Sequence, residues 1–256
     1  MRPRARLTFF ARWPILCFMT AILLSGGMDS TTLLWWLKAR QQGPIHAISI
    51  DYGQRHRIEL ECAARLAHRA EVAAHKTLAL DLAALGGNPL TDPTVDVPTA
   101  ESKRQRDTVV PFRNMLFATL AAAYCATKGI VDLYMAPVKD DYAAYRDCRR
   151  PFYESLEQSL RLGAAHDAPW AIHVPFVKLW KRDIVAIGLK LGVPYEETHT
   201  CYEGLRPACG VCDACCERLA AFAANRACDP LAYAAASTAR LSSPNAKAQP
   251  TGEKTL

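Results

Sequence analysis

The sequence lacks the motifs by which several common classes of enzyme are recognised. It contains neither G-x-x-x-x-G-K-[ST] nor G-x-G-x-x-G, so the P-loop and the dinucleotide-binding fingerprint are both absent. No Ser-His-Asp set, catalytic thiol arrangement or open hydrolytic metal site emerges, and no internal repeat is visible. The uncharged run from Trp13 to Met28 is too short and too Gly-interrupted for a membrane span. The function must therefore be sought in less common patterns.

The composition is that of an ordinary globular protein. The chain has 256 residues, 50% apolar and 22% charged, enough for one substantial core or two small ones. Its net charge of +6 indicates tolerance for anionic ligands and not a nucleic-acid footprint. A basic, then apolar N-terminus resembles a signal peptide, but cleavage near Ser25 would destroy a strand that the next motif needs. We expect a cytoplasmic protein with a dispensable extension at 1–18, a true start at Met19 and a disordered tail at 229–256.

Between the two ends, short β-like runs alternate with helical patterns. Strands are expected at 20–24, 45–50, 75–80, 130–136 and 171–175, and helices at 30–40, 56–70, 111–128 and 181–191. Pro111 stands at a natural first-turn position of the third helix, and Gly192 and Pro194 end the fourth. This alternation predicts an α/β fold with a doubly wound parallel sheet and helices on both faces.

A glycine-rich turn follows the first expected strand. The stretch Leu24-Ser25-Gly26-Gly27-Met28-Asp29-Ser30-Thr31 leads from that strand into a helix. Backbone N–H groups at such a helix N-terminus form an anion site, and glycine lets phosphate approach the backbone closely. The hydroxyls of Ser25, Ser30 and Thr31 can add donors. The alternative is a tight strand-to-helix turn that binds no ligand.

Four of the ten cysteines crowd into eight positions, which favours metal ligation in a reducing compartment over a disulfide framework. Cys209-x-x-Cys212-x-x-Cys215 supplies three thiolates, and Cys201 can fold back as the fourth ligand. Four sulfurs in tetrahedral geometry suit a closed, structural Zn²⁺ site. An iron–sulfur cluster, disulfides or coincidence are the alternatives. Cys216 adjoins a ligand and is expected to point away.

The motif S-G-G-x-D-S after a strand resembles the PP-loop of the ATP pyrophosphatase superfamily. Further stretches narrow the resemblance, in order: Ser49–His56, Val110–Asn114, Asp141–Arg149 and Lys181. Together with the cysteine cluster they identify the chain as similar to the 7-cyano-7-deazaguanine synthase family, over roughly Thr20 to Phe222. The chain departs from that family's pattern between Ala136 and Arg146.

The resemblance implies a fold, a reaction and a set of partners. The fold would be an adenine nucleotide alpha hydrolase-like domain at 19–195, followed by a zinc-binding subdomain at 196–228. The reaction would turn 7-carboxy-7-deazaguanine, ammonia and ATP into the 7-cyano compound of queuosine biosynthesis, through adenylated carboxylate and amide intermediates. Mg²⁺ would accompany ATP. A homodimer is one option for assembly, and neither a membrane nor a nucleic acid is expected as a partner.

The resemblance also implies roles for individual residues, each with a simpler alternative. Asp29 would hold Mg²⁺, or only cap the helix dipole. Lys181 would bind ATP phosphates, or be a solvated helix start. Arg113 would act with Asp29 and Lys181 in catalysis. The residues expected to recognise the substrate, whose alternative is surface capping or an exposed turn, are Arg113, Asn114, Asp141, Tyr142, Tyr145 and Asp147.

Two other functions are compatible with parts of the pattern. A PP-loop enzyme with another acceptor, such as a tRNA thiolase, would need a reactive cysteine near the ATP site, and Cys148 is the obvious candidate. A zinc-knuckle RNA-binding module would need a basic, aromatic-rich surface around the cysteines. The charges of that segment are balanced, which disfavours the RNA-binding module.

Overall fold

The computed structural model describes residues 19–40, 43–164 and 169–234. The predicted extension at 1–18 and the part of the predicted tail from 235 to 256 lie outside the described residues.

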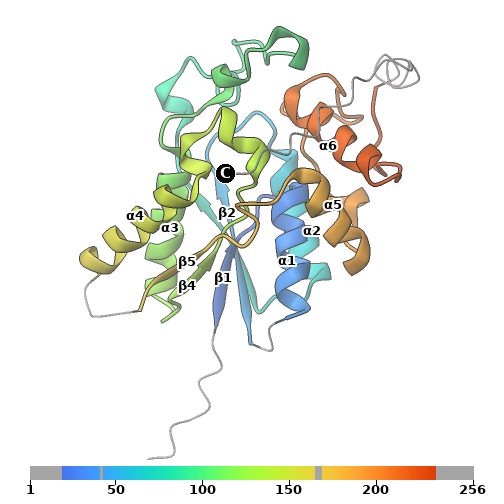
Figure 1. Ribbon diagram of the computed structural model, residues 1–256. Coiled ribbons are helices and arrows are strands. Elements are labelled where there is room, and N and C mark those ends of the chain that lie inside the picture. The colour runs from blue at the N-terminus through green and yellow to red at the C-terminus, as the bar shows by residue number, and fades with distance from the viewer. Residues whose placement is uncertain (1–18, 41–42, 165–168, 235–256) are drawn as a thin grey trace, which may run out of the picture.

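A parallel sheet of five strands forms the centre of the protein (Figure 1). Its order is β3-β2-β1-β4-β5, with β1 at Thr20–Leu23, β2 at Ile45–Asp51, β3 at Ala74–Ala79, β4 at Asp132–Tyr134 and β5 at Ala171–His173. In the register, Thr20 lies opposite Ile45 on one side and Asp132 on the other. The winding therefore reverses direction at β1. The predicted α/β fold with a doubly wound parallel sheet is confirmed.

Helices cover both faces of the sheet (Figure 1). One face carries α1 (Met28–Lys38), α2 (Ile58–Arg69) and α5 (Lys181–Leu191), and the other carries α3 (Arg113–Ala126) and α4 (Arg150–Gly163). Because side chains alternate along a strand, Ile22 packs with α1 and α2 while its neighbour Ala21 packs with α3. Strands buried on both faces read as nearly continuous apolar runs, as β1 does after Thr20.

Two helices were not anticipated, and the start of a third was placed wrongly. Helix α4 buries Tyr153 and Leu156 against the sheet, and α6 (Asp213–Ala224) follows the cysteine cluster. Helix α3 begins at Arg113, so the expectation that Pro111 occupies its first turn is wrong. Phe112 interrupts the segment with a left-handed backbone (φ 55°), which turns the chain before the helix can begin.

The C-terminal subdomain contacts α5 by means of its own helix, α6. It includes the chain as far as Ala234. The fully buried Arg218 of α6 donates to both carboxylate oxygens of Asp229, at 2.7 and 2.8 Å, and to Thr198 Oγ1 at 2.6 Å. Ala208 forms an isolated β-bridge with Tyr233. The ordered chain thus continues past position 228, where the sequence analysis placed the end of the subdomain, because a buried arginine needs the Asp229 carboxylate as its partner.

The described residues include one helical stretch, Gln105–Ala126, that is long and apolar enough to cross a membrane by length and composition alone. Its second part is helix α3, whose Ala118, Ala121 and Cys125 are buried in the core beside the sheet.

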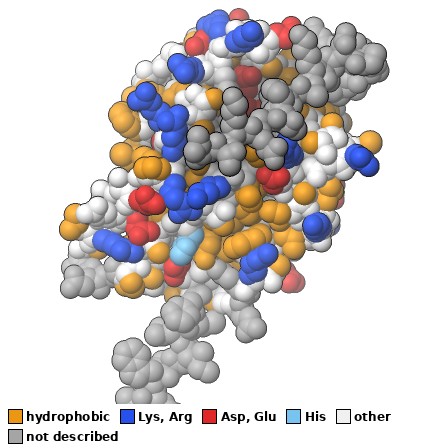
Figure 2. Space-filling view, in the orientation of Figure 1, with side chains coloured by type: hydrophobic (Ala, Val, Ile, Leu, Met, Phe, Trp, Pro, Cys, Tyr) orange, Lys and Arg blue, Asp and Glu red, His pale blue; other side chains and the backbone are white. Residues whose placement is uncertain are grey.

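On the face that Figure 2 shows, Lys and Arg side chains are interspersed with acidic and hydrophobic ones.

Candidate functional site

A cavity of about 280 Å³ opens at the carboxyl ends of the strands. It lies where the loop after β1 meets the segment after β4, Met135 to Pro137, and is closed by residues of α3, α5 and α6. Ligands bind at such a reversal point in open α/β sheets, since the loops diverge there and leave a crevice. The cavity is therefore the candidate functional site.

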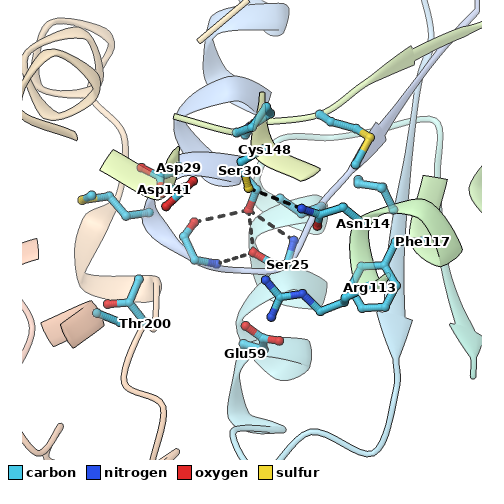
Figure 3. Close-up of a pocket in the computed structure, with 18 of the residues that line it drawn as sticks. Ser25, Asp29, Ser30, Glu59, Arg113, Asn114, Phe117, Asp141, Cys148 and Thr200 are labelled. Atoms are coloured by element: carbon cyan, nitrogen blue, oxygen red, sulfur yellow. Dashed lines mark hydrogen bonds between the residues drawn. The ribbon is translucent and has the colours of Figure 1, made fainter. Parts of the chain in front are cut away.

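The glycine loop forms the floor of this cavity (Figure 3). Gly27 is the N-cap of α1 and supplies no capping side chain, so the first N–H groups of the helix are not satisfied by one. The hydroxyls of Ser25 and Ser30 lie 2.9 Å apart, and Ser25 Oγ also accepts from the Gly27 N–H at 3.2 Å. The arrangement is that of an anion-binding helix N-terminus flanked by hydroxyls.

Two members of the predicted loop have structural tasks instead. Gly26 has φ +85°, and a Cβ there would lie 2.2 Å from the carbonyl oxygen of Glu59 and 2.7 Å from the amide nitrogen of Ala63. Its lack of a side chain is thus required by the packing of α2. Thr31 is fully buried and donates its hydroxyl to the Gly27 carbonyl at 2.7 Å, so it does not offer a donor to a ligand.

Acidic residues surround a single lysine on one side of the cavity, which we call the acidic side. Lys181 Nζ lies 3.0 Å from Asp141 Oδ1 and 2.8 Å from Glu217 Oε2, and its side chain is 12% exposed. Asp29 adjoins Asp141 (Figure 3), and its Oδ1 is buried without a hydrogen-bond partner. Burial raises the pKa of Asp29 to about 7, although Lys181 opposes this. A buried carboxylate oxygen that has no hydrogen-bond partner is well suited to bind a cation.

Arg113 occupies the opposite side, which we call the aromatic side. Tyr52, Phe117, Tyr145 and Tyr202 line it, with the Arg113 guanidinium 5.8 Å from the ring centre of Tyr145. Glu59 of α2 reaches into the same space and faces Arg113 (Figure 3). An arginine among aromatic rings can bind a planar anion in two ways at once, by paired hydrogen bonds and by stacking.

The structure brings most of the predicted site residues to this cavity. Lining it are Leu24, Ser25, Gly27, Met28, Asp29, Ser30, Arg113, Asn114, Asp141, Tyr145 and Lys181. Tyr142 and Asp147 do not line it. The Tyr142 hydroxyl donates to the Val177 carbonyl, and Asp147 accepts from the Asn114 N–H at 3.3 Å. Asp147 therefore contacts a residue of the cavity wall without lining the cavity itself, and the hydroxyl of Tyr142 is already paired elsewhere.

Cys148 lies near the candidate ATP site, but its surroundings disfavour the reactive thiolate form. It lies at the cavity wall with the Asn114 side-chain amide 3.4 Å from its sulfur. Burial raises the pKa of the Cys148 thiol far above its ordinary value. Because the thiolate is the reactive form, this environment disfavours the thiolase alternative.

Two acidic residues of the site, Glu59 and Glu217, are not predicted from the sequence. Glu59 lies three residues after His56, just beyond one of the quoted motifs, and Glu217 lies two residues after Cys215. Both line the cavity. Glu217 carries no local signal, since α6 brings it to Lys181 only through tertiary packing.

The four predicted cysteines come together near the N-terminus of α6. The sulfur atoms of Cys201, Cys209, Cys212 and Cys215 all lie within 4.8 Å of one another. The N–H groups of Val211 and Cys212 lie 3.5 and 3.4 Å from Cys209 Sγ, and Gly210 turns the knuckle with φ 72°. Cys216 is directed instead toward the Gly210 carbonyl. This cluster could hold a metal ion, as a closed site with four sulfur ligands.

We predict that Asp29→Asn stabilises the ligand-free protein at alkaline pH. The pKa of Asp29 is about 7 in the folded state against an ordinary 3.8, so ionisation costs stability progressively as the pH rises between these values. Removing the charge should raise the free energy of unfolding by about 1–2 kcal/mol at pH 8. The gain should vanish near pH 4. Urea unfolding at both pH values is the measurement, and a variant less stable at pH 8 would contradict the assignment.

We also predict that Cys215→Ser and Cys216→Ser will differ in metal content, because Cys215 is an expected metal ligand and the adjacent Cys216 is not. The first change should reduce metal content from about one ion per chain to nearly none and expose the subdomain to unfolding. The second should retain metal and melting temperature. Elemental analysis with thermal melting checks both, and equal metal content in the two variants would rule out the four-sulfur site.

Comparison with known proteins matches nearly all the described chain. The family described as "Queuosine biosynthesis protein QueC" matches residues 19–226. A "7-cyano-7-deazaguanine synthase" from Clostridium kluyveri is 41% identical over 218 residues, covering 83% of this chain and 96% of the relative. The protein of the same name from Nostoc punctiforme is 42% identical over 222 residues, covering 83% and 98%.

Among solved structures, an NMN synthetase from Francisella tularensis aligns with 76% of this chain and 69% of its own, at 18% identity and a TM-score of 0.45. The sequence matches confirm the resemblance that the motifs indicated. The chain belongs to the queuosine biosynthesis protein QueC family.

Proposed function

We propose that this protein is an ATP-dependent 7-cyano-7-deazaguanine synthase. The observation that carries the proposal is a single cavity in which an uncapped helix N-terminus meets a buried carboxylate, a lysine and an arginine within aromatic walls. Relatives that carry this name match 83% of the chain and nearly the whole of their own length, which supports the same activity here. The substrates would be 7-carboxy-7-deazaguanine, ammonia and ATP.

Different parts of the cavity suit ATP and the deazapurine substrate. The N–H groups at the start of α1, with Ser25 and Ser30, would bind the ATP phosphates. Arg113 would bind the carboxylate of the deazapurine, whose rings would stack on Tyr145. Lys181 would move from its acidic partners to phosphate oxygens as ATP enters, since all of them compete for the same ammonium group. Asn114 and Asp141 would complete the walls.

Two metals are proposed, for different purposes. Asp29 offers a buried oxygen without a partner, which fits Mg²⁺. When bound beside ATP, Mg²⁺ would neutralise charge on the departing pyrophosphate. The four thiolates fit Zn²⁺ by number and softness, and the closed site would be structural. Thiolate ligation requires a reducing compartment, so we propose a cytoplasmic protein with an ATP-binding domain at 19–195 and the metal subdomain after it.

The chemistry follows from the need for a good leaving group. A carboxylate or amide oxygen leaves poorly, whereas AMP leaves well. The carboxylate oxygen would attack the α-phosphorus of ATP and expel pyrophosphate, after which ammonia displaces AMP to give the amide. The amide oxygen would then attack a second ATP, and loss of AMP and protons leaves the nitrile. Positively charged groups directed at the negative charge that develops on the departing pyrophosphate would stabilise both attacks on ATP.

The proposed function is tested by incubating the protein with 7-carboxy-7-deazaguanine, ATP, Mg²⁺ and ammonium, with product analysis by mass spectrometry. We expect the nitrile, with about two AMP and two pyrophosphate per nitrile formed, because both oxygens leave as AMP. Omitting the deazapurine should stop AMP formation and is the control. ADP and phosphate as the only nucleotide products would contradict the proposal.

The two loop glycines make a matched pair of variants. Gly27 has an ordinary backbone, and an added Cβ would lie 3.3 Å from Ser25 Oγ and 3.6 Å or more from other atoms. Gly27→Ala should therefore fold, with a change in stability of about 1 kcal/mol or less, but lose ATP binding because its methyl group occupies the phosphate site. Gly26→Ala should destabilise the fold by about 1–3 kcal/mol, since it pushes α2 away.

Calorimetric ATP titration and urea unfolding on both variants distinguish the two effects. Gly163→Ala is the control, because that position meets no atom within 4 Å and lies far along α4. Wild-type ATP affinity in a well-folded Gly27→Ala protein would show that the loop is only a turn.

A further inference from the structure

The proposed reaction needs a group that accepts protons from nitrogen, and none of the residues discussed above has been given this role. Ammonia is mostly ammonium at neutral pH and must lose a proton before its nitrogen can attack. The attack forms a C–N bond, breaks the C–O bond to AMP and releases a second proton from nitrogen. In the nitrile-forming step, the C–O bond to the second AMP breaks as nitrogen releases its last two protons. A proton acceptor beside the reacting carbon would therefore act repeatedly.

Most basic groups of the described cavity are committed elsewhere. Asp141 and Glu217 hold Lys181, and Asp29 faces the proposed cation site. Burial lowers the pKa of His56 to about 3, so its imidazole is a weak base. Among the carboxylates that line the cavity, Glu59 is the one on the aromatic side, where Arg113 would hold the substrate carboxylate.

The fold fixes Glu59 against the loop. It lies in the first turn of α2, and its carbonyl oxygen occupies the space that a Cβ of Gly26 would take. Its side chain is 14% exposed and enters the cavity beside Ser25 and Arg113 (Figure 3). Gln54 donates to Glu59 Oε1 at 3.2 Å, and His56 Nε2 lies 3.5 Å from the same oxygen. One oxygen is thus held, and the carboxylate keeps its second oxygen for a ligand.

The surroundings of Glu59 suit a small cation. The rings of Tyr52 and Phe117 have centres 5.0 Å apart and line the same side of the cavity. A carboxylate with aromatic faces nearby attracts ammonium-type ions by charge and by the ring quadrupole. Arg113 opposes such a cation when the cavity is empty, but a substrate carboxylate on the guanidinium cancels that charge. Ammonium would then follow the carboxylate substrate in order.

Resting on the proposed function, we propose that Glu59 binds ammonium and takes its proton, and is the proton acceptor for amide and nitrile formation. The second carboxylate oxygen would accept an N–H proton and pass it to water at the open mouth of the cavity. Burial raises the pKa of Glu59 to about 8, against the opposing effect of Arg113. A carboxyl group with this pKa is ionised in part at neutral pH and mostly above pH 8, and its ionised form is a stronger base toward ammonium than an ordinary glutamate, which supports the assignment.

The test compares wild type, Glu59→Gln and Glu61→Gln in full-length protein. Glu61 lies on the same helix but is exposed, so Glu61→Gln is the matched control and should behave as wild type. Substrate-dependent exchange of pyrophosphate into ATP reports adenylation, which needs no ammonia. Amide and nitrile formation from ammonium report the proposed step. Hydroxylamine in place of ammonium reports attack by a nucleophile that is uncharged at neutral pH.

We expect Glu59→Gln to slow pyrophosphate exchange by less than about threefold but ammonium-dependent product formation by about 100-fold or more. Hydroxylamine should restore much of the rate of acyl transfer, since it needs no deprotonation before attack. Glu59→Asp, which keeps the carboxylate, should retain more activity with ammonium than Glu59→Gln.

Three outcomes would overturn the inference. Wild-type turnover with ammonium in Glu59→Gln would show that no proton transfer depends on the carboxylate. Equal loss of exchange and turnover would indicate a structural role. A raised KM for the deazapurine in the exchange reaction alone would assign Glu59 to recognition of the purine edge. Failure of wild type to make any nitrile would instead contradict the proposed function, so the two failures are distinguishable.

Discussion

The close approach of α2 to the loop after β1 is the contact on which the candidate site depends. It exists because Gly26 has no side chain and adopts a left-handed backbone, so that the carbonyl of Glu59 can occupy the place of a Cβ. The same contact sets the loop between two helices that pack on one face of the sheet. It aligns the start of α1 toward the cavity, and it brings the first turn of α2 to the aromatic side. One missing methyl group therefore helps to form both the candidate anion site and its neighbouring wall.

A second constraint joins the C-terminal subdomain to the end of the sheet where the cavity lies. Lys181 begins α5 and pairs with Asp141 from the segment after β4 and with Glu217 from α6. Gln105 donates to the other oxygen of Glu217 at 3.1 Å. Since α6 begins at the cysteine cluster, the position of Glu217 follows from the folding of that cluster. The subdomain thus contributes a side chain to the cavity in addition to packing on α5.

Local patterns allowed much of this protein to be predicted. The alternation of strand-like and helical stretches indicated a parallel sheet, and the glycine turn between β1 and α1 indicated an anion site at their junction. The spacing of the cysteines predicted all four sulfur positions and the exclusion of Cys216. Such patterns can be recognised without the tertiary structure, because each is formed by residues that are close together in the sequence. Helix α3 was misplaced at its start, because Phe112 takes a strained backbone that no propensity indicates.

Taken alone, the sequence determined the fold class, the loop between β1 and α1, and the four cysteines that come together, since each depends on hydrophobic period or short spacing. Only the tertiary structure decided that Gly26 serves helix packing, that Tyr142 and Asp147 do not line the cavity, and that Glu59 and Glu217 do. These facts depend on contacts between elements far apart in the chain. The orientation of a side chain across such a contact is set by packing and burial, which a linear pattern does not contain.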